Sequence, residues 1–304
     1  MLIKPSAVLC ACLLLLAACA GDANTANGRP QVVASFYPFA FVAEQVGGDL
    51  VDVENLTQPG AEPHDLELTP QQVADLTDAT LVVYERGFQP AVDDGVDQAD
   101  LPGVATVDVA DIVDLVPASQ HGIDPDSEEG GGLDPHIWLD PVAMEQITRA
   151  VAGRLAQVDP HHRATYQRNG DRLIGQLRQL DTAYQRGLAH CRRNTIVTSH
   201  DAFGYLADRY GLEQIPIAGI DPNNEPSPAQ QAKIVDLVRQ DGITTVFTET
   251  LVSSDIAESI ANETGVAVAT LDPIEGLSAD TADQTYLTLM RANLDALRRA
   301  DDCT

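Results

Sequence analysis

The sequence predicts an α/β protein with two similar lobes, each a parallel sheet flanked by helices, joined by one long connecting helix. Three observations support this prediction. Short apolar segments alternate with amphipathic ones from Gln31 onward, the opening pattern returns in the second half of the chain, and a long helical pattern separates the two copies. The chain has 304 residues, of which 44% are hydrophobic and 21% charged, so it is long enough for two folded lobes.

Residues 1–19 are predicted to be a secretory signal. Lys4 is the only charged residue among them, residues 7–18 are an apolar run, and the segment ends in Leu16-Ala17-Ala18-Cys19. This ending resembles the bacterial lipobox, in which the cysteine is diacylated; an ordinary cleaved signal is the alternative. We therefore expect a lipid on Cys19 to anchor the protein. The protein would then lie on the outer face of the cell membrane or in a periplasm. Residues 20–30, rich in Gly, Asn, Ala and Thr, are the expected flexible tether.

Residues 31–159 are the predicted first lobe. The expected strands are residues 31–36, 51–56, 80–85 and, more weakly, 105–110, and the expected helices are residues 39–47, 69–79 and 141–158. Thr69 and Asp140 have the side chains of N-caps, and each is followed by a proline at the first helical position. Both helix starts are therefore well defined by the sequence.

Residues 160–190 are the predicted connecting helix, and residues 191–304 are the second lobe. The connector carries apolar residues at helical spacing, and a helix of this length would extend about 45 Å, enough to run along both lobes. The second lobe repeats the first weakly: residues 199–211 align with residues 35–47, and TTVFTE corresponds to TLVVYE. Chance similarity between two βα units is the alternative.

Four side chains with metal-binding atoms stand far apart in the sequence, at nearly even intervals: His64, His136, His200 and Asp272. Three imidazoles and one carboxylate form a donor set typical of a closed zinc site. Because no two of them can share a helix turn, tertiary structure must assemble the site from separate loops. Ligands this far apart favour a site between two lobes.

Each candidate also has a structural interpretation when considered alone. His64 could be a loop histidine, His136 could pack beside Trp138, and Asp272 could be an N-cap or turn residue. Two further carboxylates near His64, those of Glu62 and Asp65, could accept an imidazole N–H or simply be solvated. Because His200 and Asp272 both follow apolar strands, where ligands gather in parallel sheets, the four residues together favour a metal site.

Several segments of the chain form a specific combination. They are PGAEPHDLELTP, DPHIWLDP, HDAFGYLADRYGL, the EPSP that begins at Glu225, the FTET that contains Glu249, and LDPIEG. From about residue 31 to 304 the chain resembles the zinc-binding lipoproteins of bacterial metal-uptake ABC transporters, the cluster A-I solute-binding proteins. The resemblance implies two α/β lobes, ligands at His64, His136, His200 and Asp272, a supporting role for Glu249, and delivery of Zn(II) to an ABC transporter permease.

The metal and the reaction class have alternatives. Manganese-type relatives usually carry Glu where this chain has His200, and an additional imidazole favours zinc over manganese. A zinc hydrolase would leave the fourth position to water, whereas Asp272 is expected to fill it here, and the chain contains no HExxH, GxSxG or GxGxxG motif. We therefore expect a binding protein and not an enzyme. An adhesin, suggested by the surface location of some relatives, is a third possibility that no residue pattern distinguishes.

The segment 119–133 departs from the pattern of many zinc-binding relatives, which carry a long His-rich loop there. In this chain it is acidic and Gly-rich, and His121 is its only histidine. Acidic side chains of the loop, or a separate zinc metallochaperone, could guide zinc to the site instead.

Cysteine content and charge limit the other interactions. Outside the signal the chain has only Cys191 and Cys303, and an even pair in an exported protein predicts a disulfide, with two free thiols as the alternative.

The formal net charge of -28 argues against binding of nucleic acid and would concentrate cations near the surface; adaptation for solubility explains the charge equally well. We expect a monomer.

Overall fold

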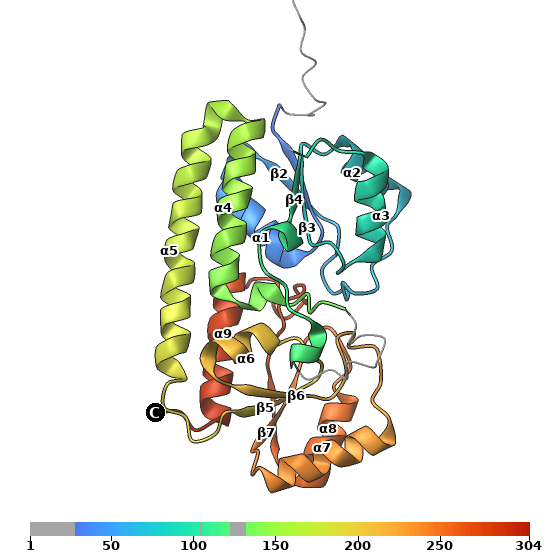
Figure 1. The fold of residues 1–304 in the computed structure, drawn as a ribbon, viewed down its shortest axis with the longest axis vertical. Helices are drawn as coiled ribbons and strands as arrows, with labels where there is room; N and C mark the ends of the chain where they lie inside the picture. The colour runs from blue at the N-terminus through green and yellow to red at the C-terminus, as the bar shows by residue number, and fades with distance from the viewer. Residues whose placement is uncertain (1–27, 104, 122–131) are drawn as a thin grey trace, which may run out of the picture.

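The computed structural model describes residues 28–103, 105–121 and 132–304. Two lobes are stacked along the longest axis of the molecule, and a group of long helices runs beside them (Figure 1). The predicted signal with Cys19, most of the predicted tether and the centre of the acidic loop 119–133 lie outside the described residues. Among the helices that are described, none has the length and apolar character needed to cross a membrane.

The first lobe contains a parallel four-stranded sheet in the order β2-β1-β3-β4. Its elements are β1 (Gln31–Ala34), α1 (Tyr37–Gly47), β2 (Asp52–Asn55), α2 (Pro70–Asp78), β3 (Leu81–Tyr84), α3 (Pro90–Ala99) and β4 (Thr106–Asp108). The predicted start of α2 is confirmed: the Thr69 hydroxyl accepts a hydrogen bond from the Gln72 N–H, and the Gln72 side chain accepts one from the Thr69 N–H. The helix α3 was not predicted.

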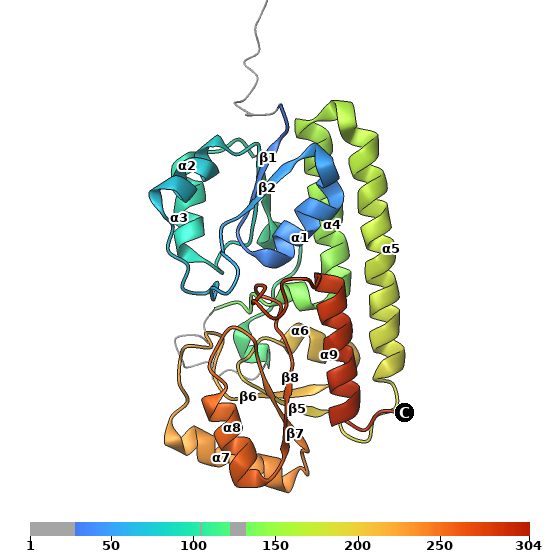
Figure 2. The ribbon, with the colours of Figure 1, turned by 180° about the vertical axis from the view of Figure 1, so that it is seen from behind.

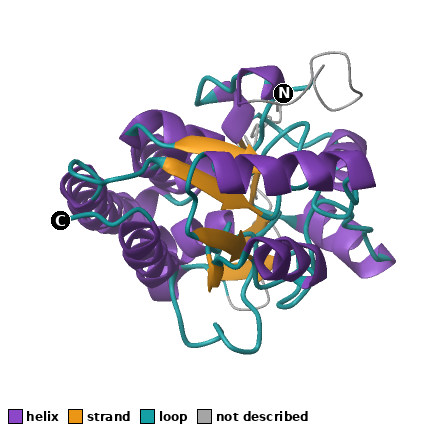
Figure 3. Cartoon of the chain, turned by 90° about the horizontal axis from the view of Figure 1, so that it is seen from below, coloured by secondary structure: helices purple, strands orange, loops and turns teal. Residues whose placement is uncertain are grey.

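The second lobe has the same strand order, β6-β5-β7-β8, and again all strands are parallel. Its elements are β5 (Thr195–Thr198), α6 (Gly204–Tyr210), β6 (Glu213–Pro216), α7 (Pro228–Gln240), β7 (Thr245–Thr248), α8 (Asp255–Thr264), β8 (Ala267–Thr270) and α9 (Tyr286–Ala300). The strands β5 and β7 follow β1 and β3 at the same offset in the sequence as the two aligned segments. The predicted repeat is therefore present in the fold, and helices lie on both sides of the strands (Figure 3).

The first lobe ends in a long helix, and an antiparallel helix beside it connects the two lobes. The helix α4 (Pro141–Val158) begins where predicted, because the Asp140 carboxylate accepts a hydrogen bond from the Val142 N–H. The following helix, α5 (Arg163–Gly187), has 25 residues and so spans about 37 Å. It is shorter than predicted at both ends, because Pro160–His162 form a separate 3-10 turn and the helix already ends at Gly187. It still runs beside both lobes, next to α4 and α9 (Figure 2).

A continuous apolar core crosses the seam between the lobes. The largest buried cluster includes Val32 of the first lobe, Phe247 of the second and Leu177 of the connecting helix. Polar contacts cross the same seam: the Trp138 indole N–H donates to the Pro273 carbonyl at 2.7 Å, and the Tyr286 hydroxyl donates to the Trp138 carbonyl at 2.6 Å. The lobes are therefore fixed to each other by packing as well as by the connecting helix.

The predicted disulfide is confirmed, and it joins Cys191 to Cys303. Cys191 lies between α5 and β5, and Cys303 lies in the tail that follows α9. The backbone N–H groups of Arg192 and Arg193 donate to the Asp301 carbonyl beside it. The tail of the chain is thus attached to the start of the second lobe by a covalent bond and by hydrogen bonds.

Candidate metal site

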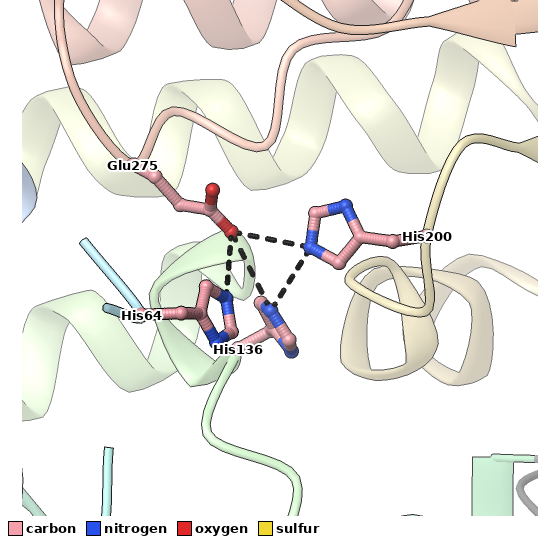
Figure 4. A group of neighbouring side chains, drawn as sticks. All are labelled: His64, His136, His200 and Glu275. Carbon is pink, nitrogen blue, oxygen red and sulfur yellow. Dashed lines mark hydrogen bonds and ion pairs between the residues drawn. The ribbon is translucent and has the colours of Figure 1, made fainter. Parts of the chain in front are cut away.

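Four side chains from both lobes converge at the seam: His64, His136, His200 and Glu275 (Figure 4). His64 lies in the loop after β2, and His136 begins a short 3-10 turn (Ile137–Leu139) beyond β4. His200 follows β5 closely, and Glu275 lies a few positions after β8. Each ligand candidate therefore lies beyond the carboxyl end of a parallel strand, where such sheets place their binding sites.

The geometry of the group is that of a metal site. One ligand atom from each of the four residues lies within 4.8 Å of the other three. The Glu275 Oε1 atom is 3.6, 3.5 and 3.3 Å from the Nε2 atoms of His64, His136 and His200. The side chains of His136, His200 and Glu275 are at most 1% exposed, and that of His64 is 8% exposed. Three ring nitrogens and one carboxylate oxygen, enclosed by protein, form a four-coordinate zinc donor set.

Two of the imidazoles are oriented by buried carboxylates. The His136 Nδ1 atom lies 2.8 Å from Asp134 Oδ1, and the His200 Nδ1 atom lies 2.6 Å from Glu249 Oε1. When Nδ1 donates its hydrogen to a carboxylate, the lone pair remains on Nε2, the atom that faces the group. The carboxylates of Asp134 and Glu249 therefore select the tautomer that can bind a metal. Glu249 is in the place that the sequence suggested, whereas Asp134 was not singled out.

The third imidazole, His64, is held mainly through its loop. Both oxygens of Glu62 accept the backbone N–H of His64, at 3.1 and 3.0 Å, and Asp65 accepts a hydrogen bond from the Asn223 amide at 2.9 Å. The Gly60 N–H donates to the Leu277 carbonyl of the second lobe at 2.8 Å. Glu62 and Asp65 therefore fix the loop that carries His64, instead of accepting its ring N–H as the sequence suggested.

The carboxylate of the group differs from the one predicted, because Glu275 and not Asp272 joins the three imidazoles. The Asp272 carboxylate accepts hydrogen bonds from the Ile274 N–H at 2.7 Å and from the Thr250 hydroxyl at 3.2 Å. Asn293 of α9 holds the backbone N–H and carbonyl of Asp272. Asp272 is thus a turn residue, the alternative interpretation. The turn brings Ile274 to a left-handed φ of 59° and directs Glu275 to the site.

Charge in the metal-free group is balanced by protons. Burial lowers the pKa of His200, but the carboxylates of Glu249 and Glu275 outweigh it and hold that pKa well above 6.5. Burial raises the pKa of Glu275, but the positive charge of His200 and the hydrogen bonds from the imidazoles leave it well below 4.5. Both shifts favour a protonated imidazole beside an ionised carboxylate where a cation would lie, and a metal ion that binds His200 must displace its proton.

Two α/β lobes that enclose a small polar site at their seam are typical of solute-binding proteins, and here the donor set indicates a metal ion as the solute. The family model described as ZnuA, zinc-uptake complex component A, periplasmic, matches residues 32–300. The chain belongs to this family, as its motifs indicated.

Relatives and solved structures support the same assignment. The chain is 33% identical over 303 residues to the high-affinity zinc uptake system protein ZnuA of Bacillus subtilis, covering 96% of this chain and 95% of the relative. It is 34% identical over 298 residues to the zinc-binding lipoprotein AdcA of Streptococcus pneumoniae R6, covering 96% of this chain but only 59% of that longer protein.

The structure of the Zn(II)-bound ZnuA-like domain of S. pneumoniae AdcA matches with a TM-score of 0.76 and 32% identity, covering 90% of this chain and 99% of that one. The laminin-binding protein Lmb of Streptococcus agalactiae, described as having adhesin and metal transporting activity, matches with a TM-score of 0.78 and 34% identity, covering 89% and 99%. The two-lobed fold predicted from the sequence is thereby confirmed.

Proposed function

We propose that this protein captures Zn(II) outside the cytoplasm and delivers it to an ABC transporter permease. The observation that carries the proposal is the convergence of three imidazole nitrogens and one carboxylate oxygen within 4.8 Å of one another. The zinc ligands are His64, His136, His200 and Glu275. The relatives named for zinc uptake and zinc binding support the choice of metal.

Zinc is preferred to manganese at this site because of its donors. Manganese favours oxygen ligands and higher coordination numbers, whereas three imidazoles with one carboxylate suit four-coordinate zinc. Asp134 and Glu249 further strengthen His136 and His200 as nitrogen donors by accepting their Nδ1 hydrogens. Manganese binding remains the competing function within the same family.

The same four donors support binding without catalysis. A catalytic zinc site keeps one coordination position for water, and here Glu275 occupies the fourth corner of the group. The four side chains are also almost completely buried, which leaves little room for a substrate at the metal. The chemistry of the site is therefore exchange of an ion for protons.

The proposed cellular setting is supported by the signal-like residues 1–19 and by the lipoproteins among the relatives. We place the protein on the outer face of the cell membrane or in the periplasm, anchored through a lipid on Cys19 and acting as a monomer. A zinc metallochaperone is a further candidate partner, which would load the site in place of the His-rich loop.

In cells that lack their own zinc-binding protein, the wild-type chain should restore growth under zinc chelation, and C19S should restore it less well.

Elemental analysis of protein purified without added metal, followed by calorimetric titration with Zn(II) and Mn(II), tests the metal assignment. We expect one zinc per chain and an affinity for zinc at least about 100-fold above that for manganese. Preferential retention of manganese, or a stoichiometry well below one, would contradict the proposal.

A further inference from the structure

His121 is a buried histidine outside the group of metal ligands. Its side chain is 2% exposed, and its Nδ1 atom lies 2.5 Å from Asp134 Oδ2. The other oxygen of the same carboxylate, Oδ1, lies 2.8 Å from the Nδ1 atom of the ligand His136. One fully buried carboxylate thus stands between two imidazoles, of which only one belongs to the metal site.

The His121 ring also docks on the helix α6 of the second lobe. Its Nε2 atom is 3.3 Å from Asp208 Oδ2, and its ring meets that of Tyr205 edge to face at 5.0 Å. A Cβ atom at Gly204 would lie 2.1 Å from the His121 Nδ1 atom, so only glycine leaves room for the imidazole. The Tyr205 hydroxyl donates to the Asp134 carbonyl at 2.7 Å, which fastens the same segment to α6.

We propose that His121 is a positioning residue for metal binding: it fixes the Asp134 carboxylate, and through it the His136 ring, when the first lobe is docked on α6. The inference rests on the proposed function of the site. His136 itself makes two hydrogen bonds to the Asp134 carboxylate, from its backbone N–H at 2.9 Å and from Nδ1 at 2.8 Å, but both go to Oδ1. A carboxylate held at one oxygen can still turn about it, and the imidazole that it orients would turn with it. A second imidazole on the other oxygen removes this freedom before the metal arrives and so lowers the ordering cost of binding.

The charges around His121 support this role. The titratable groups that face it are Asp134, Asp208, Asp201 and Tyr205. Burial lowers the pKa of His121, but the Asp134 hydrogen bond and charge, with those of the other carboxylates, raise it above 6.5 overall. Both ring nitrogens have carboxylate acceptors, as a protonated imidazole requires. Zinc bound at His136 would repel this charge, so binding should release part of a proton from His121.

Five variants test the inference in the full folded chain: H121F, H121N, H121A, G204A and the double variant H121A/G204A. The H121F change keeps the ring but removes both nitrogens, and we expect zinc affinity to fall about tenfold. In H121N the amide can replace Nδ1 as a donor to Asp134, so affinity should largely return. G204A should weaken binding as H121F does, whereas in the double variant the added methyl group should cost nothing beyond H121A. H190F, at an exposed histidine, is the matched control.

The number of protons released on zinc binding distinguishes an electrostatic link between His121 and the metal site from a role of His121 in packing alone. Calorimetry in buffers of different ionisation enthalpy should show fewer protons released per zinc by H121N than by the wild type. Equal zinc affinities of the wild type and a folded H121F, or a loss in H121F that H190F reproduces or H121N fails to recover, would overturn the inference and leave the proposed function intact. If H121F does not fold, G204A decides: a zinc affinity of folded G204A equal to that of the wild type overturns it. Failure of the wild type itself to bind zinc would instead refute the proposed function.

Discussion

Glu85 and Glu249 occupy equivalent places in the two lobes, yet their surroundings differ. Each directly follows the third strand of its lobe, β3 or β7, so the repeat aligns the two residues. Glu249 accepts the Nδ1 hydrogen of His200 at 2.6 Å. Glu85 is 2% exposed, and within the described part of the chain neither of its oxygens has a hydrogen-bond partner. The residue equivalent to His200 in the first lobe is Phe36, which explains the missing partner.

The comparison shows that the repeated fold supplies positions and that single side chains decide whether a position becomes part of the site. Burial, with the charge of Asp134, raises the pKa of Glu85 well above 4.5 and so favours the protonated form of this carboxyl group. In the second lobe, an imidazole at the end of β5 makes the equivalent carboxylate an anchor for a metal ligand. The first lobe contributes its ligands from longer loops instead, with His64 after β2 and His136 beyond β4.

The largest expected effect comes from removing the imidazole that distinguishes the lobes. Zinc sites of four ligands contribute roughly 10–16 kcal/mol, so H200A should lose about 3 kcal/mol, or about 100-fold in zinc affinity. Competition with a chelator of known affinity measures the loss, and H162Q, at an exposed histidine in the 3-10 turn before α5, is the control. An affinity of H200A within about threefold of the wild type would show that the second lobe does not bind the metal.

A smaller effect is expected from the two glutamates themselves. E249Q leaves an amide beside His200 and should lower zinc affinity about tenfold or more, because the imidazole loses its charged acceptor. E85Q should leave zinc affinity unchanged, since the pKa of Glu85 is raised and its oxygens make no hydrogen bond to any residue that the structure describes. The same titrations measure both variants. Equal effects of the two substitutions would remove the distinction between the lobes.

The pH dependence should differ in sign between the metal-free and the zinc-bound protein. The raised pKa of His200 stabilises the metal-free fold below pH 6.5, and this contribution is lost as pH rises through the raised value. The depressed pKa of Glu275 contributes above pH 4.5 and is lost only as pH falls through its folded value. Zinc replaces the protons, so its stabilisation should grow with pH, by up to about tenfold in affinity per pH unit for each proton displaced.

Thermal unfolding between about pH 5.5 and 9, with and without zinc, tests this sign. The unfolding temperature of the metal-free protein should fall toward high pH while the increment from zinc rises. Parallel pH curves for the two forms would mean that zinc does not exchange with protons at these side chains.

The smallest effect on metal binding is expected from the disulfide, which belongs to the second lobe alone. C191S/C303S should lose about 2–4 kcal/mol of unfolding free energy, because the bond joins cysteines at a sequence separation of 112, yet zinc affinity should change less than twofold. Chemical denaturation and zinc titration of the same variant measure the two quantities. A large loss of zinc affinity would show that the site depends on the tail as well as on the strand ends.

Much of the fold was predictable because local chemistry and tertiary structure agree. Apolar strands, the caps at Thr69 and Asp140 and the offset of the repeat all indicated the architecture. The helix α3 was not predicted because Gly95 and several aspartates disfavour a helix. In the structure a Cβ at Gly95 would lie 2.8 Å from Leu76 of α2, so close packing between the helices requires the glycine.

The three imidazoles of the site could be selected from the sequence, but the carboxylate could not. Asp272 and Glu275 stand in the same LDPIEG segment, and Asp272 closely follows a strand as ligands often do. Two features determine which carboxylate reaches the site: the left-handed turn at Ile274, and the hydrogen bonds from the Asn293 side chain to the backbone of Asp272. Both depend on tertiary structure. The contact of Asp134 with His121 was hidden for the same reason, although Asp134 stands just before His136 in the DPH motif.

A crystal structure of the zinc-loaded protein tests the central claim most directly. We predict one Zn(II) with the Nε2 atoms of His64, His136 and His200 and an oxygen of Glu275 at about 2.0–2.2 Å. Asp272 should remain hydrogen-bonded to the Ile274 N–H. Coordination by Asp272 or by an exchangeable water, with Glu275 turned away, would contradict the account.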